Sequence, residues 1–174
     1  GMDSAISGRP CDFSKKLFAL GVFPGERVIL ITRNRIQGVI ALLGIWFANA
    51  TAVLIDPNLT KSILEKQIKT ADARFILLEN EQQSIEIKNN IISETQQKDC
   101  DENIATLIFT SGTTGDYKAV VLRHDQYIYL TQFYNTLSEQ TGCCLTVLPL
   151  FHVAGLFCGF LQPLLLGVRI VFFR

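Results

Sequence analysis

The sequence predicts an α/β fold of largely parallel sheets flanked by helices. Short runs rich in β-branched residues alternate with longer segments in which apolar residues recur every three or four positions. A strand, helix, strand, helix, strand order is typical of right-handed βαβ units on a parallel sheet. Hydrophobic residues make up 48% of the 174-residue chain and charged residues 18%, so the chain has enough apolar surface to fold around a core.

The first βαβ-type unit is predicted over residues 12–78. Residues 1–11, before it, are interpreted as a cloning scar, because Gly1 precedes Met2, followed by an N-terminal arm. Turn-forming residues separate the expected elements, as at Asp56-Pro57-Asn58. The elements expected in this unit are a strand at Glu26–Thr32, a helix within Asn34–Ala50, a strand at Thr51–Ile55, a helix at Leu59–Thr70 with Thr60 as its N-cap candidate, and a strand at Arg74–Glu79.

Residues 79–103 are predicted to be an exposed polar connector, because Gln, Asn, Lys and Glu dominate a segment of weak periodicity. A second unit is expected over residues 104–174. Its expected elements are a strand at Ala105–Ser111, a glycine-rich loop, a strand at Ala119–Arg123, a helix at Asp125–Glu139, a strand at Cys144–Leu150, a loop around Phe151-His152, a helix ending at Leu166 and a strand at Val168–Phe173.

Composition excludes several function classes. A formal net charge of +0 and a pI near 6.9 leave no electrostatic footprint for nucleic acid. Five cysteines without a C-x-x-C pair, and only two histidines, favour free thiols in a reducing cytosol over disulfides or a metal site. The apolar stretch Val39–Ile55 falls slightly short of a membrane span, and Val153–Phe173 is longer. Turn residues after the first and polar or turn residues within the second favour a chain without a span. We therefore expect a cytoplasmic protein.

The segment Phe109–Val121, FTSGTTGDYKAVV, places a hydroxyl- and glycine-rich hexapeptide between two apolar runs. Thr110–Gly115 offers hydroxyl and amide donors, and its glycines allow the backbone to direct amides at one point. Lys118 adds a positive charge three residues after Gly115, which suits a phosphate. The spacing matches neither a Walker A loop nor a dinucleotide loop. By composition alone, a hairpin turn explains the glycines equally well.

The same segment resembles the phosphate-loop signature of the adenylate-forming superfamily, T-S-G-T-T-G-x-P-K-G-V. That superfamily comprises acyl-CoA synthetases, luciferases and peptide-synthetase adenylation domains. Residues 18–60 resemble its opening βαβ unit, and LPLFHVAGL, Leu148–Leu156, resembles its P-L-F-H-x-x-G-L segment. The likeness extends from Asp12 to the last residue and covers only the N-terminal portion of family members, with a fainter similarity to o-succinylbenzoate–CoA ligases.

The resemblance implies roles for particular residues. Lys118 would lie beside the β- and γ-phosphates of ATP, and His152 would lie near the acyl pocket and thiol tunnel; both are the implied catalytic residues. Tyr117 stands where the signature has proline and Ala119 where it has glycine, and both changes alter the backbone conformations open to the loop. The residues implied to wrap the phosphates are Thr110, Ser111, Gly112, Thr113, Thr114 and Gly115.

The resemblance also implies the reaction of a longer parent enzyme. A small-molecule carboxylate and Mg·ATP would give acyl-AMP and pyrophosphate, and a thiol, expected to be that of CoA, would then accept the acyl group. The adenine, ribose and C-terminal lysine segments of the family do not occur in this sequence, so we expect an N-terminal fragment that is inactive alone. The alternative is a non-catalytic interaction or regulatory module derived from a truncated adenylation domain.

The last expected strand also predicts self-association. Its apolar side chains Val168, Ile170 and Phe172 are expected to lose part of their cover at the truncated edge. Exposing a few hundred Å² of apolar surface at about 25 cal/mol per Å² costs several kcal/mol. A two-fold dimer that pairs this edge with itself would recover that energy.

Overall fold

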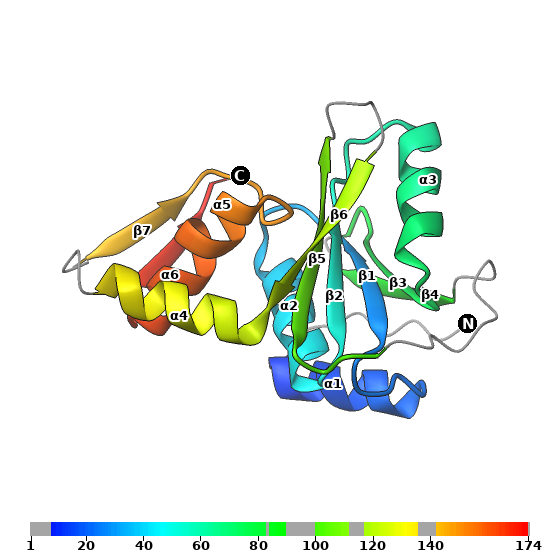
Figure 1. Ribbon diagram of the computed structural model, residues 1–174, viewed down its shortest axis with the longest axis horizontal. Helices are drawn as coiled ribbons and strands as arrows, with labels where there is room; N and C mark the ends of the chain where they lie inside the picture. Colours follow the sequence, from blue (N-terminus) through cyan, green and yellow to red (C-terminus); the bar gives the residue numbers. More distant parts are fainter. Residues whose placement is uncertain (1–7, 83, 90–99, 112–116, 136–141, 174) are drawn as a thin grey trace.

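The computed structural model describes residues 8–82, 84–89, 100–111, 117–135 and 142–173. Within these ranges the strands form a six-stranded sheet in the order β4-β3-β1-β2-β5-β6 and a two-stranded sheet of β7 and β8 (Figure 1). The strands are β1 (Arg27–Ile31), β2 (Thr51–Ile55), β3 (Phe75–Glu79), β4 (Ile85–Asn89), β5 (Ile104–Ser111), β6 (Tyr117–Arg123), β7 (Cys143–Thr146) and β8 (Arg169–Phe172). The helices are α1 (Pro10–Ala19), α2 (Ile36–Phe47), α3 (Lys61–Ala71), α4 (His124–Asn135), α5 (Val153–Leu156), the π-helical η1 (Phe157–Leu161) and α6 (Gln162–Leu165).

The middle of the large sheet is parallel, as predicted. β1 pairs in parallel with β2 and β3, and β2 pairs in parallel with β5. The edge strands β4 and β6 run antiparallel to their neighbours, so the sheet as a whole is mixed. All five residues of β2 are buried, because helices cover both faces of the sheet at that strand.

The two faces of the sheet bury different sets of side chains. Successive residues of a strand point to opposite faces, so Leu30 and Leu54 contribute to the core shared with α1 and α2. Their neighbours Ile29 and Val53 contribute to the smaller core beneath α3. The helices that follow β1 and β2 therefore lie on opposite faces of the sheet.

The predicted elements of residues 26–79 are confirmed, with ends that differ by a few residues. Thr60 precedes α3 in the N-cap position, although its side chain makes no capping hydrogen bond. Helix α1 was not predicted. It packs against α2, where Phe13 lies so close to Gly44 that a Cβ there would overlap the ring.

The expectation that residues 79–103 form only an exposed connector is wrong, because β4 lies within them. Ile85 is buried and Ile87 packs against the main core, while Glu86 between them and Lys88 after them are exposed. This period-two pattern spans only five residues of a polar segment, and pairing with β3 is what stabilises it. Residues 90–99 lie outside the described ranges.

The residues expected to form the second unit, 104–174, contribute to both sheets. β5 and β6 belong to the large sheet, and α4 leads from β6 toward the small parallel sheet, on the left of Figure 1. The expected strand at Cys144–Leu150 ends at Thr146, and the expected single helix before Leu166 is divided into α5, η1 and α6. Buried residues of α5 and η1, among them Leu156 and Phe160, extend the core of the large sheet.

Val168, Ile170 and Phe172, which were expected to lose part of their cover, lie on the less exposed face of β8. Ile170 and Phe172 are partly buried against the main core. The other face of β7 and β8 is exposed. It presents Leu145 and Val171 from the two strands, and Val147 and Phe173 from the residues that directly follow them. No helix in the ranges that the structure describes is both long and apolar enough to cross a membrane.

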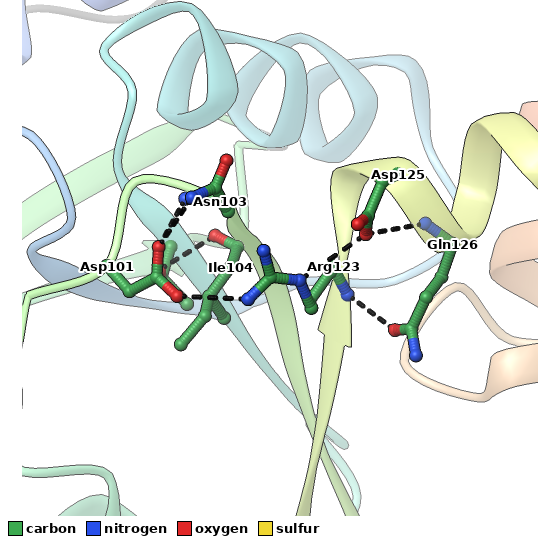
Figure 2. A network of polar contacts seen from close by, with 7 residues as sticks. Asp101, Asn103, Ile104, Arg123, Asp125 and Gln126 are labelled. Carbon is green, nitrogen blue, oxygen red and sulfur yellow. Dashed lines mark hydrogen bonds and ion pairs between the residues drawn. The ribbon is translucent and has the colours of Figure 1, made fainter.

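A network of hydrogen bonds and ion pairs connects the open end of the β5–β6 hairpin with the first residues of α4 (Figure 2). The guanidinium group of Arg123 contacts Asp101 at 3.2 Å and Asp125 at 3.4 Å. The Arg123 amide also donates to Gln126 Oε1 at 2.8 Å. The Asn103 backbone amide and side chain donate to Asp101 and lower the pKa of its carboxyl group. The network lies at the end of the hairpin opposite to the glycine-rich loop.

Candidate functional site

The glycine-rich loop connects two strands of an antiparallel hairpin. In the β5–β6 register, Thr110 lies opposite Lys118 and Ser111 lies opposite Tyr117. The hairpin interpretation of the flanking residues is therefore confirmed, and it is compatible with a phosphate loop at the tip. The predicted phosphate-binding residues Gly112, Thr113, Thr114 and Gly115 lie outside the described ranges.

A cleft of about 280 Å³ opens beside this hairpin, at the carboxyl ends of β2 and β5. β2 and β5 are parallel neighbours, and open α/β sheets bind ligands outside the carboxyl ends of their parallel strands. Apolar residues such as Leu54 and Phe151 form much of the wall. The polar lining residues are Asp56, Gln67, Thr110, Tyr117 and His152.

Two of the predicted site residues meet at this cleft. Thr110 is the last β5 residue among those that line the cleft, and its hydroxyl lies 3.5 Å from the Lys118 carbonyl oxygen. His152 reaches the cleft from the segment that precedes α5. Sequence positions 42 residues apart thus contribute to one cavity, and only the fold brings them together.

Lys118 is exposed on β6 and does not line the cleft. Side chains directly opposite in an antiparallel pair share a face, so Lys118 lies on the same face as Thr110, and Tyr117 lies on the other. The hydroxyl of Thr110 and the ammonium of Lys118 can therefore act on one side of the hairpin.

The two departures from the family signature have different structural consequences. Ala119 lies inside β6, opposite Phe109, and is not among the residues with positive φ. The strand conformation is open to any residue, so glycine is not required there. Tyr117 adds a half-buried aromatic side chain to the cleft wall, which a proline would not.

His152 is held by contacts within its own segment. Its backbone amide donates to the Pro149 carbonyl oxygen at 3.0 Å, and its Nδ1 accepts from the Ala154 amide at 3.3 Å. Since Nδ1 accepts a hydrogen bond, a neutral ring carries its proton on Nε2, which is free to donate. A Cβ at Gly155 would overlap the Pro149 carbonyl, so the turn requires a residue without a side chain.

Three polar residues of the cleft wall, namely Asp56, Gln67 and Tyr117, were not predicted as site residues. Asp56 directly follows β2, so its place at the carboxyl end of a parallel strand was a usable signal. Gln67 is buried within α3 and no local pattern distinguishes it. The ranges that the structure describes contain no group of three or more His, Cys, Asp or Glu side chains able to hold a metal ion.

Known proteins match this chain over nearly its whole length. A family model described as AMP-binding enzyme matches residues 8–174. The 2-succinylbenzoate–CoA ligase of Geobacillus kaustophilus (strain HTA426) is 26% identical over 83% of this chain and 32% of its own length. The chain thus spans about a third of that curated relative.

Solved structures share the fold. The o-succinylbenzoate coenzyme A synthetase (MenE) from Bacillus subtilis, solved in complex with AMP, has a TM-score of 0.73 at 22% identity. That match covers 94% of this chain and 47% of the other. The same enzyme solved with ATP and a magnesium ion has a TM-score of 0.73 at 20% identity, covering 95% of this chain and 48% of the other.

Proposed function

The chain belongs to the AMP-binding enzyme family, and on that premise we propose that it is the N-terminal portion of an ATP-dependent acyl-CoA ligase. The observation that supports this most directly is the cleft where Thr110, Tyr117 and His152 meet beside the hairpin. The Geobacillus relative is named as a CoA ligase, which supports CoA as the acceptor. The Bacillus enzyme was solved with ATP and with AMP, which supports these nucleotides as ligands. An aromatic carboxylic acid like that of the relatives is the substrate class we favour.

In the proposed first step, a carboxylate oxygen attacks the α-phosphorus of ATP. A new bond forms between that oxygen and phosphorus, the bond from phosphorus to the bridging oxygen of the β-phosphate breaks, and pyrophosphate leaves. Thr110, with Ser111 to Gly115, and Lys118 would stabilise the negative charge that develops on pyrophosphate. The Thr110 hydroxyl and the exposed Lys118 ammonium fit this task because they share a face of the hairpin.

In the proposed second step, the thiolate of CoA attacks the acyl carbon and AMP leaves. His152 would donate from Nε2 toward the carbonyl oxygen, which gains negative charge as the thiolate adds. Magnesium bound with ATP would neutralise phosphate charge. We assign it to no residue of this chain, because the described residues contain no ligand cluster for it.

We further propose that these 174 residues bind nucleotide weakly and do not complete the reaction. The chain spans 32% of the Geobacillus relative and 47–48% of the Bacillus structures, so much of the relatives' length has no counterpart in it. We therefore expect no carboxylate-dependent exchange of pyrophosphate into ATP from the 174-residue protein. Robust exchange would contradict this part of the proposal.

Nucleotide binding tests the proposed function directly. Isothermal titration with Mg·ATP should detect binding, and Lys118→Ala should weaken it about tenfold, the equivalent of about 1.4 kcal/mol for one lost charge-assisted contact. Lys88→Ala is the matched control, because Lys88 lies on β4, the opposite edge strand of the same sheet. Equal affinities for the wild type and Lys118→Ala would remove Lys118 from the site, and no binding at all would reject the proposal.

A further inference from the structure

We propose that Asn34 is a positioning residue, whose side-chain amide holds residues 148–150 and thereby places His152 at the cleft. Asn34 lies in the turn between β1 and α2, and no motif of the sequence distinguishes it. Its Nδ2 donates to the Leu148 carbonyl oxygen at 2.8 Å, and its Oδ1 accepts from the Leu150 amide at 2.9 Å. The two contacts span 114 and 116 residues of sequence.

The chemistry of the contact requires an amide. One backbone acceptor and one backbone donor face the side chain, so the orientation with Nδ2 toward Leu148 satisfies both, whereas the flipped amide would satisfy neither. Leu150 is only 3% exposed, so its amide would lack a ready replacement from water if the side chain were removed. An aspartate carboxylate would accept from Leu150 but repel the Leu148 oxygen.

The turn that presents Asn34 is itself held from a neighbouring strand. The carboxylate of Glu79, at the end of β3, accepts from Thr32 Oγ1 at 3.0 Å and from the Arg33 amide at 2.9 Å. Its other oxygen lies 2.8 Å from Arg35 Nη1, and the Glu79 side chain is 2% exposed. Residues on both sides of Asn34 are therefore attached to the large sheet.

The segment that Asn34 holds leads directly to His152. The His152 amide bonds to Pro149, which lies between the two residues that Asn34 contacts. The Leu156 amide bonds to the His152 carbonyl at 2.9 Å, and Gly155 packs against the Pro149 carbonyl. A displacement of residues 148–150 would therefore move His152 relative to Thr110, which lines the same cleft.

We call the two contacts of Asn34, with Leu148 and Leu150, the Asn34 clamp. The clamp does not depend on any ligand, whereas a role for the position of His152 in catalysis rests on the proposed function. The test uses the 174-residue protein and two-dimensional NMR. Asn34→Ala should lower the hydrogen-exchange protection of the Leu150 amide at least tenfold and shift the His152 resonances. Asn89→Ala, an exposed asparagine on β4, is the matched control and should change neither.

Asn34→Asp provides the readout that a merely space-filling role would not produce. A neutral carboxyl group donates one hydrogen bond and accepts another, as the amide does, so the clamp should re-form when this side chain is protonated. Repulsion from the Leu148 oxygen raises its folded pKa above the unfolded value of about 3.9. At pH 7 the ionised side chain still accepts from the Leu150 amide but repels the Leu148 oxygen, so only one of the two contacts remains. The Leu150 protection factor should therefore approach the wild-type value below about pH 4 and lie between those of the wild type and Asn34→Ala at pH 7.

The possible outcomes separate the two proposals. Unchanged Leu150 protection in Asn34→Ala, or no pH dependence in Asn34→Asp, would overturn the clamp. Lost protection with unchanged His152 resonances would show that the clamp does not position His152. If Asn34→Ala fails to fold, the pH dependence of Asn34→Asp still decides. Failure of the wild type to bind Mg·ATP would reject the proposed function and leave the clamp result intact.

Discussion

The guanidinium group of Arg74 contacts both oxygens of the buried Glu26 carboxylate, with Nε 2.5 Å from Oε1 and Nη2 2.9 Å from Oε2. The Phe23 amide also donates to Oε2 at 3.1 Å. The hydrogen bond to Glu26 raises the pKa of Arg74, and the rings of Phe23 and Phe75 lie 5.4 and 4.9 Å from its guanidinium carbon. Glu26 precedes β1 and Arg74 precedes β3, so the pair joins the amino ends of two adjacent strands.

Glu26→Gln should destabilise the protein by roughly 2–4 kcal/mol, because it removes the charge of a carboxylate that is 1% exposed and leaves the partly buried Arg74 guanidinium group without its partner charge. The free energy of unfolding from urea titration is the measurement. Glu86→Gln, at an exposed carboxylate on β4, should change it by less than about 0.5 kcal/mol. Equal effects of the two substitutions would show that burial of the pair does not matter.

Gly155→Ala should destabilise the protein by about 1–3 kcal/mol, because the new Cβ would overlap the Pro149 carbonyl and force the backbone to move. The melting temperature reports the loss, and the His152 NMR resonances report the movement of the segment. Gly8→Ala is the control, since a Cβ there would meet Asp12 Cβ at an ordinary 3.8 Å. A fully stable Gly155→Ala protein would mean that residues 149–155 yield more easily than their packing indicates.

Tyr127 predicts a loss of stability in alkaline solution. Burial raises the pKa of Tyr127 to about 12, against an opposing effect of the Thr106 hydroxyl. Both hydroxyl oxygens are buried without a hydrogen-bond partner of good geometry among the described residues. Because the folded pKa exceeds the unfolded value of 10.0, the stabilisation is complete below pH 10 and is lost as the pH rises toward 12, by up to roughly 2–3 kcal/mol.

The matched variant is Tyr127→Phe, which lacks the ionising group. The difference in unfolding free energy between the two proteins should be constant below pH 10 and should shift in favour of Tyr127→Phe above it. Absorbance of tyrosinate should show that one of the four tyrosines ionises later than the others. A parallel pH dependence of the two proteins would contradict the raised pKa.

The exposed face of β7 and β8 predicts that a second copy of this chain binds there. Val171 and Phe173 are exposed apolar residues on that face, and covering them with an identical face would recover about 25 cal/mol per Å². Light scattering over a dilution series should show a dimer at high concentration. Val171→Lys with Phe173→Lys should abolish it, whereas Lys61→Glu, an exposed substitution on α3, should not. A monomer at every concentration would reject the prediction.

Local patterns determined most elements of the large sheet. The β-branched runs and the helical spacing predicted β1, α2, β2, α3 and β3, because each of these segments buries one face or both and the pattern of apolar residues records it. β4 was not predicted, because five alternating residues within a polar segment are too weak a pattern to indicate a strand. The pairing with β3 is what stabilises it. The motif predicted Lys118 and His152 as site residues, but it could not show that, of these two, His152 lines the cleft and Lys118 does not.

Tertiary structure decided which face is covered and which distant groups meet. Alternation along β8 separates Ile170 from Val171, but the sequence does not state which of them faces the core, and the covered face proved to be that of Ile170. The contact of Asn34 with Leu150 depends on a turn held by Glu79 and on a loop 116 residues away. Hydrogen bonds between distant segments cannot be predicted from the spacing of apolar residues. That spacing indicates which face of one element is buried, but not which residue lies opposite it in the fold.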